Sequence, residues 1–251
     1  MGVPPLHRRL LAEFIGSASL AAVVIGSGIA AQQLSPNDVG LELLENAAAT
    51  GAGLYVLIVM LGPVSGAHFN PVVSGVAAWF GGISWRDVLA YVPAQVLGCV
   101  TGAILANGMF AKAAVSISQH HRANPAHLLA EVVATAGLVL VIFTLVQTRR
   151  TALVAAAVGA YIAAAYFFTS STSFANPAIT IGRMFSNTFA GIAPASVPAF
   201  IAAQIVGGVL GLLGVRLLYP IPPIAEELPD EHGPLRLPAE RRSLADEPSA
   251  V

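Results

Sequence analysis

The chain has 251 residues, of which 56% are apolar and only 10% charged, and its mean hydropathy is +0.75. Soluble domains carry about 25% charged residues, so this composition excludes an ordinary soluble domain and indicates an integral membrane protein. The net charge of −1 gives no reason to expect nucleic-acid binding. The single cysteine, Cys99, cannot form an intrachain disulfide and is expected to be a small buried residue. A mercury-sensitive thiol is the alternative.

Six apolar stretches are predicted to cross a bilayer as helices, for which about 20 residues are needed. The first follows a basic N-terminus like that of a signal peptide, but its length predicts a retained transmembrane helix. The predicted spans are residues 10–31, 47–61, 88–110, 128–146, 152–168 and 195–218.

Two Asn-Pro segments, Asn70-Pro71-Val72 and Asn176-Pro177-Ala178, lie between spans two and three and between spans five and six. Proline is tolerated in the first turn of a helix, and asparagine before it is a good N-cap. We therefore expect two half-length helices, over 72–80 and 178–185. Within a membrane, both would point the positive ends of their dipoles, and two Asn amides, at one place.

The two halves of the chain repeat. Residues 12–16 (AEFIG) in span one correspond to 130–134 (AEVVA) in span four, and 94–98 (AQVLG) correspond to 203–207 (AQIVG). Because each half has three spans, the second copy must be inverted, so the half-helices enter from opposite faces and meet at mid-membrane.

The distribution of basic residues predicts that both termini are cytoplasmic. The basic residues on the predicted cytoplasmic side are Arg8, Arg9, Arg86, Arg149, Arg150 and Arg216, whereas the opposite loops hold few. One of those few, Arg122, follows His120-His121 and is expected to be a solvated loop residue. The tail, residues 219–251, is rich in Pro, Glu and Arg and is predicted to be disordered.

At this point the chain resembles the aquaporin, or major intrinsic protein, superfamily over about residues 8–218, and is similar to its bacterial branch associated with arsenic resistance. The motifs that carry the resemblance are AEF at 12–14, SGAHFNP at 65–71, Glu131, NPA at 176–178 and the two AQxxG runs. The resemblance implies an all-α integral membrane fold. Its six transmembrane helices and two re-entrant half-helices form an inverted repeat, about 8–110 and 126–218. It also implies a pore in each subunit, a homotetramer, a bacterial inner membrane, and passive passage of small neutral solutes with no cofactor.

Physical reasoning on the paired asparagines agrees with this expectation. Their amides can donate to a passing oxygen, while the half-helix dipoles repel protons and cations. Val72 replaces the family's usual alanine and is expected to add volume beside the junction without disturbing the fold.

Three further polar residues in the apolar segments are expected to act as scaffold. Glu13 and Glu131 lie within spans, where ionisable groups generally face the bundle interior, and in the family the matching glutamates hold the re-entrant loops. A proton relay is the alternative. His68 matches a loop-organising residue, and the sequence shows no partners for a metal site there.

The main departure from the family follows the second Asn-Pro-Ala, where Ile179 replaces the usual arginine. Arg183 lies one helical turn further on, and either reaches the vestibule or anchors at the interface. Counting by the family's spacing puts the other constriction residues at Thr50, Ala164 and Ser173, with Tyr161 and Tyr166 as replacements for Ala164. Ile179 and the three counted residues Thr50, Ala164 and Ser173 are all modest in size, which predicts a constriction wider than that of a strict water pore.

The function predicted is a passive channel for neutral solutes such as arsenite, methylated arsenicals, glycerol, urea and water. The alternatives are a water-selective aquaporin, a coupled secondary transporter with inverted repeats, and a structural role. No nucleophile–base pair, phosphate loop or metal-ligand cluster suggests an enzyme.

Overall fold

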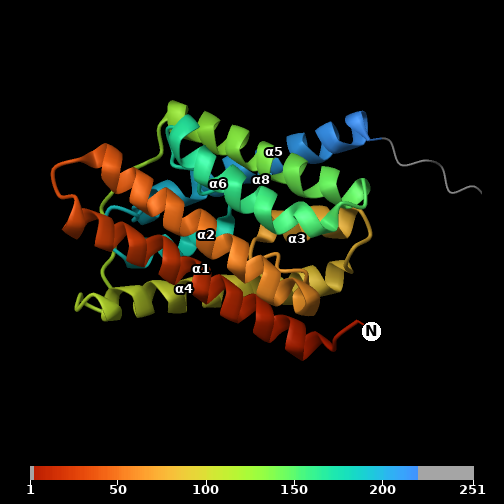
Figure 1. Ribbon diagram of the computed structural model, residues 1–251, viewed down its shortest axis with the longest axis horizontal. Helices are drawn as coiled ribbons and strands as arrows, with labels where there is room; N and C mark the ends of the chain where they lie inside the picture. Colours follow the sequence, from red (N-terminus) through yellow and green to blue (C-terminus); the bar gives the residue numbers. More distant parts are fainter. Residues whose placement is uncertain (1–2, 220–251) are drawn as a thin grey trace, which may run out of the picture. The chain divides into compact units, whose positions relative to one another are not determined.

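The computed structural model describes residues 3–219, and these residues form helices joined by loops, without a strand (Figure 1). The α-helices are α1 (Leu6–Leu34), α2 (Val39–Ser65), α3 (Pro71–Trp79), α4 (Trp85–Met109), α5 (Pro125–Gln147), α6 (Val154–Phe168), α7 (Pro177–Gly182) and α8 (Val197–Leu218). Short 3₁₀ turns cover Thr151–Leu153, Arg183–Phe185 and Pro194–Ser196. Residues 220–251, nearly all of the predicted disordered tail, lie outside the described part.

The six predicted spans are confirmed, because six helices within residues 3–219 are long and apolar enough to cross a membrane. Most extend beyond the predicted apolar stretches. Polar N-caps account for three of these extensions: the side chains of Asp38, Ser84 and Asn124 each accept a backbone N–H of the first turn, so α2, α4 and α5 begin before their apolar runs do.

The Gly62-Pro63 pair does not break its helix, although glycine and proline both disfavour a helix interior. Helix α2 continues through Pro63 to Ser65 and ends at Gly66, whose φ of 88° is left-handed. Transmembrane helices tolerate an internal proline, whereas a left-handed residue after the last turn is a common helix end that favours glycine.

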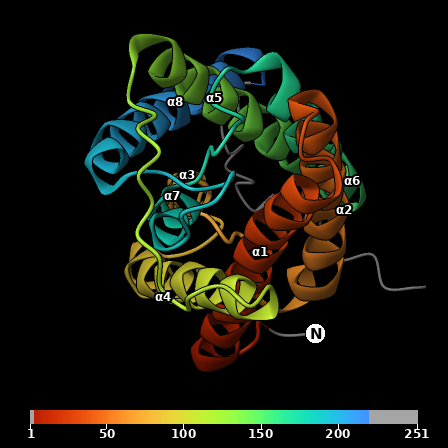
Figure 2. The same cartoon turned by 90° about the vertical axis from the view of Figure 1, so that its left-hand side faces the viewer.

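The helices pair in the same way in both halves: α1 packs on α4 and α2, and α5 packs on α8 and α6. Viewed end-on, the long helices surround α3 and α7 (Figure 2). Matching glycines bring the helices of each half together. A Cβ on Gly98 would lie 2.5 Å from the Phe14 carbonyl oxygen, and one on Gly207 would lie 2.5 Å from that of Val132.

Candidate functional site: a cavity beside two Asn-capped half-helices

The two asparagines hold the half-helices together. The Oδ1 atom of Asn70 accepts from Val72 N at 2.9 Å, and that of Asn176 accepts from Ala178 N at 2.9 Å. Each amide also donates to the opposite re-entrant loop, Asn70 Nδ2 to Ala175 O at 2.8 Å and Asn176 Nδ2 to Phe69 O at 2.7 Å. An amide carries two N–H donors, so one on each asparagine remains available to a solute.

Glu13 ties the first re-entrant loop to the bundle through four hydrogen bonds. Its Oε1 accepts from Ser65 Oγ at 2.6 Å and His68 N at 3.0 Å, and its Oε2 accepts from Phe69 N at 2.7 Å and Gln95 Nε2 at 2.8 Å. The side chain is completely buried. With both oxygens engaged by donors that belong to the fold, this carboxylate acts as a scaffold.

Glu131 repeats the arrangement in the second half. Its Oε1 accepts from Ser171 Oγ at 2.6 Å and Phe174 N at 2.9 Å, and its Oε2 accepts from Ala175 N at 2.9 Å and Gln204 Nε2 at 2.7 Å. Thus His68 and Phe174 occupy matching positions in the two loops, as do Gln95 and Gln204. The inverted repeat therefore extends to individual hydrogen bonds.

Both loops use left-handed backbone at matching positions. Ala67 and Phe69 have φ of 50°, and Ser173 and Ala175 have φ of 49° and 46°. Such conformations cost a non-glycine residue roughly 1–3 kcal/mol and are retained where the surroundings impose them. Here the four glutamate bonds of each half impose them.

A cavity of about 830 Å³ runs along the two half-helices. One wall is apolar and comes from α2, α5 and α6, and the other comes from the two re-entrant loops. The residues that represent these walls are Leu54, Ile58, Leu138, Phe143, Val158 and Ile162 on the apolar side, and Gly66–Asn70 and Ser173–Asn176 on the loop side. A small solute can therefore bury its carbon skeleton on one side and hydrogen-bond on the other.

The cavity has a polar end, defined here as Thr50, Tyr166, Ser173, Ile179 and Arg183, all of which line it. The Thr50 and Tyr166 hydroxyl oxygens lie 3.2 Å apart. The buried Ser173 Oγ has no hydrogen-bond partner within residues 3–219. This end therefore offers one unused hydroxyl to a solute.

The placement of Ala164 in the constriction is wrong. Ala164 is exposed and does not line the cavity, whereas Tyr166, two residues on, does. Two residues of an α-helix turn the side chain through about 200°, so a count that is off by two selects the opposite face. The other replacement considered, Tyr161, donates to Ala134 O at 3.0 Å and is also absent from the lining. An aromatic side chain does stand at this end, contrary to the prediction that all the residues there are modest in size.

Arg183 lies at the polar end and is not an interfacial anchor. Its side chain is 2% exposed and lines the cavity. The guanidinium carbon lies 3.4 Å from the centroid of the Phe174 ring, and Nε donates to the carbonyl oxygen of Ala190. Of the two alternatives drawn from the sequence, the structure supports the one in which this side chain reaches the vestibule.

Val72 does not line the cavity, so its extra volume does not take space from it. A Cβ on Gly208 of α8 would lie 2.5 Å from Val72 Cγ1. Gly208 therefore provides the space for the larger side chain.

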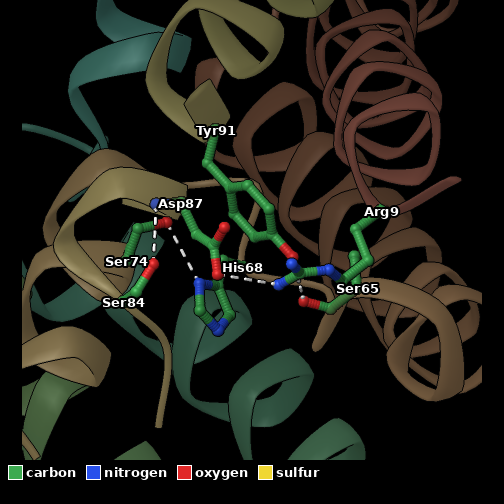
Figure 3. Close-up of polar contacts among 7 residues, drawn as sticks. All are labelled: Arg9, Ser65, His68, Ser74, Ser84, Asp87 and Tyr91. Carbon is green, nitrogen blue, oxygen red and sulfur yellow. Dashed lines mark hydrogen bonds and ion pairs between the residues drawn. The ribbon is translucent and has the colours of Figure 1, made fainter. Parts of the chain in front are cut away.

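His68 belongs to a cluster near the end of the bundle where α1 begins (Figure 3). Its Nδ1 is 3.0 Å from Ser74 Oγ, and its ring packs edge-on against Tyr91, with centroids 5.6 Å apart. Tyr91 donates to Ser65 O at 2.9 Å, and the Arg9–Asp87 ion pair of 3.1 Å closes the cluster. No cluster of three or more potential metal ligands occurs within residues 3–219.

Arg122 has a structural role that the sequence did not reveal, since we expected a solvated loop residue. Its Nε donates to Gly191 O at 2.7 Å and its Nη2 to Phe189 O at 2.8 Å, while its guanidinium carbon lies 5.4 Å from the Phe174 ring centroid. The carbonyl partners are almost 70 residues away in the chain, so no local pattern points to them.

Known proteins are similar to this chain. Residues 3–173 match the family model described as "Major intrinsic protein". Aquaglyceroporin AqpS of Rhizobium meliloti (strain 1021) is 47% identical over 230 residues, covering 91% of this chain and 98% of that protein. A probable glycerol uptake facilitator protein of Thermotoga maritima is 36% identical over 97 residues, covering 38% of this chain and 41% of that protein.

A solved structure supports the same fold. The aquaglyceroporin from Plasmodium falciparum superposes with a TM-score of 0.66 at 21% identity, covering 84% of this chain and 96% of that one. At that identity the likeness concerns the fold alone. The family-model match and the extensive likeness to AqpS together show that the chain belongs to the major intrinsic protein family.

Proposed function

We propose that this protein is a passive transmembrane channel for small uncharged solutes. The observation that carries the proposal is the cavity with one apolar and one polar wall, which passes both asparagine side chains. The positive ends of the half-helices and the asparagine amides favour a neutral solute that carries acceptor oxygens, and they disfavour cations.

The selectivity filter in this proposal consists of Thr50, Tyr166, Ser173 and Ile179. Ile179 stands where most family members have an arginine, and an isoleucine cannot donate a hydrogen bond across the pore. Tyr166 is the one bulky residue of the four, and in this proposal the two small hydroxyl residues and the apolar side chain beside it leave room for a solute larger than water. Glycerol and urea are the first solutes to test, and the names of the relatives from R. meliloti and T. maritima support that choice.

Arsenite is the more specific candidate, as neutral As(OH)₃ or as a methylated arsenical. Its support is the resemblance of residues 174–194 to the arsenic-resistance branch of the family. As(OH)₃ presents three hydroxyls, as glycerol does, so a filter that accepts one triol suits the other.

A coupled transporter is less consistent with the site. Such a protein needs an intramembrane ionisable group that can load and release a proton or ion. Glu13 and Glu131 instead each accept four hydrogen bonds from the loops and helices that they hold.

We propose a homotetramer in the bacterial inner membrane, with both termini cytoplasmic and one pore per subunit.

A panel of swelling assays on proteoliposomes tests the function, with water, glycerol, urea and arsenite as solutes. We expect glycerol and arsenite to enter faster than into protein-free vesicles. Rapid water flow with both solutes excluded would instead support a water-selective aquaporin.

An Ile179→Arg variant tests the filter assignment. The larger charged side chain should reduce glycerol and arsenite entry more than water flow. Unchanged selectivity would show that residue 179 is not in the filter. Val72→Ala serves as the matched control, because Val72 belongs to the other Asn-Pro segment but does not line the cavity.

A further inference from the structure

Arg183 is a buried cation whose charge no carboxylate balances at contact distance. Within residues 3–219 the only ion pair is Arg9–Asp87, and the oxygens of Glu131 are already occupied by four other donors. An arginine side chain stays protonated in proteins. Its positive field therefore acts on the cavity that it lines.

Two contacts fix the position of this cation. Nε donates to the Ala190 carbonyl, and the guanidinium plane lies against the face of Phe174. Phe174 is itself held edge-on by Phe200, with ring centroids 5.2 Å apart. A planar guanidinium suits both contacts, whereas a lysine ammonium could not stack in this way.

The remaining donors of Arg183 are unused. Within residues 3–219 the one hydrogen bond of its side chain is that of Nε, and its terminal amino groups are not among the fully enclosed atoms that lack a partner, so they remain accessible. They belong to the same polar end as the unpartnered Ser173 Oγ. A solute with acceptor oxygens can satisfy both.

We propose that Arg183 supplies the positive charge of the selectivity filter, from one helical turn beyond the position at which Ile179 stands. In this arrangement the apolar Ile179 widens the pore, while Arg183 repels protons and monovalent cations and donates hydrogen bonds to neutral hydroxylated solutes. Phe174 and the Ala190 carbonyl are positioning groups. The inference rests on the proposed channel function. It assigns the channel's barrier to protons and cations to a residue outside the position at which the family usually has its arginine.

Arg122 provides a matched control. It carries the same charge and contacts the same Phe174 ring, but its guanidinium donates to the Gly191 and Phe189 carbonyls and it does not line the cavity. If only the net charge near Phe174 mattered, removing either arginine would have the same effect. If the cation that lines the cavity matters, only the loss of Arg183 changes the leak of protons through the channel.

The test uses full-length protein in proteoliposomes that contain a pH-sensitive dye. Proton entry under a potassium diffusion potential and glycerol entry are measured on the same preparation. For Arg183→Gln we expect the ratio of proton leak to glycerol flux to rise about tenfold, as the removal of a charge barrier of about 1.4 kcal/mol implies. Arg122→Gln should leave that ratio at the wild-type value, and Ile179→Arg/Arg183→Gln should lower the proton leak itself below that of Arg183→Gln by returning a cation to the filter.

An unchanged ratio for Arg183→Gln, or an equal rise for Arg122→Gln, would overturn the assignment. If Arg183→Gln does not reach the vesicles folded, Arg183→Met carries the test. It also removes the charge, so the same rise in the ratio supports the proposal and a wild-type ratio refutes it. Wild-type vesicles that admit neither water nor glycerol faster than protein-free vesicles would refute the channel function itself, which is a separate result.

Discussion

At the scale of single residues, the re-entrant loops depend on two carboxylates. Glu13 and Glu131 each accept two backbone N–H groups, one serine hydroxyl and one glutamine amide. These bonds stabilise loop residues in left-handed conformations that they would otherwise avoid. The cavity wall that the loops form therefore exists because of the glutamates, although neither glutamate lines it.

Glu13→Gln should be strongly destabilising. Glutamine offers one acceptor oxygen instead of two and turns an amide towards two donors, and a hydrogen bond to a charged group contributes about 1.5–3 kcal/mol. We expect the free energy of unfolding to fall by about 3 kcal/mol, and the apparent melting temperature in detergent by roughly 8 °C. Glu45→Gln is the control, since Glu45 accepts one side-chain bond, from Ser35, and should change stability by about 1 kcal/mol or less. Equal effects of the two changes would contradict the scaffold role.

Mercury should not block this pore. Cys99 is completely buried, its Sγ lies 3.6 Å from Ser17 O, and it does not line the cavity. Glycerol flux into proteoliposomes is therefore expected to be the same with and without mercuric chloride. Inhibition that disappears in Cys99→Ser would show that this thiol reaches the pore.

At the scale of elements, one close approach between the half-helix α3 and the long helix α8 is that of Val72 to Gly208. Val72 occupies the space that Gly208 leaves open. The departure from the family's alanine is thus matched by a glycine in the other half of the chain. Sequence reasoning recognised the departure but not its partner, because the pairing depends on how two distant helices pack.

The pair predicts a non-additive double mutant. Gly208→Ala should destabilise by about 1–3 kcal/mol, because its Cβ would overlap Val72. Val72→Ala should remove most of that loss when the two changes are combined. Thermal unfolding of the four proteins measures the coupling, and Gly75→Ala serves as control because a Cβ there meets nothing within 4 Å. Strictly additive effects would mean that the two residues do not share this space.

How far the sequence predicts an element depends on how local its cause is. The half-helices follow from Asn-Pro, a cap and a first-turn proline that act within a few residues, and the scaffold glutamates follow from the repeat. The assignment of Ala164 to the constriction was wrong because an error of two residues along a helix selects the opposite face. Arg122 could not be found, since its partners are remote carbonyls that no side-chain pattern encodes.

At the scale of the whole described molecule, the inverted repeat explains why one cavity passes both asparagines. It also places the N-terminus and the end of α8 at the same end of the bundle (Figure 1). Most basic residues of the described part are at this end, which is the basis for proposing that it is cytoplasmic.

Thiol labelling tests that orientation. In a Cys99→Ser background, Lys112→Cys should react with a membrane-impermeant maleimide in intact spheroplasts, and Arg150→Cys only after permeabilisation. Both positions are exposed and lie in loops at opposite ends of the predicted topology. The reverse labelling pattern would place both termini outside.

The central claim is that solutes cross passively, and equilibrium uptake of radiolabelled glycerol into proteoliposomes tests it most directly, with and without an imposed proton gradient. The account predicts that internal glycerol rises to the external concentration and stops there, at the same rate in both conditions. Accumulation above the external concentration when the gradient is present would contradict a passive channel and indicate coupled transport.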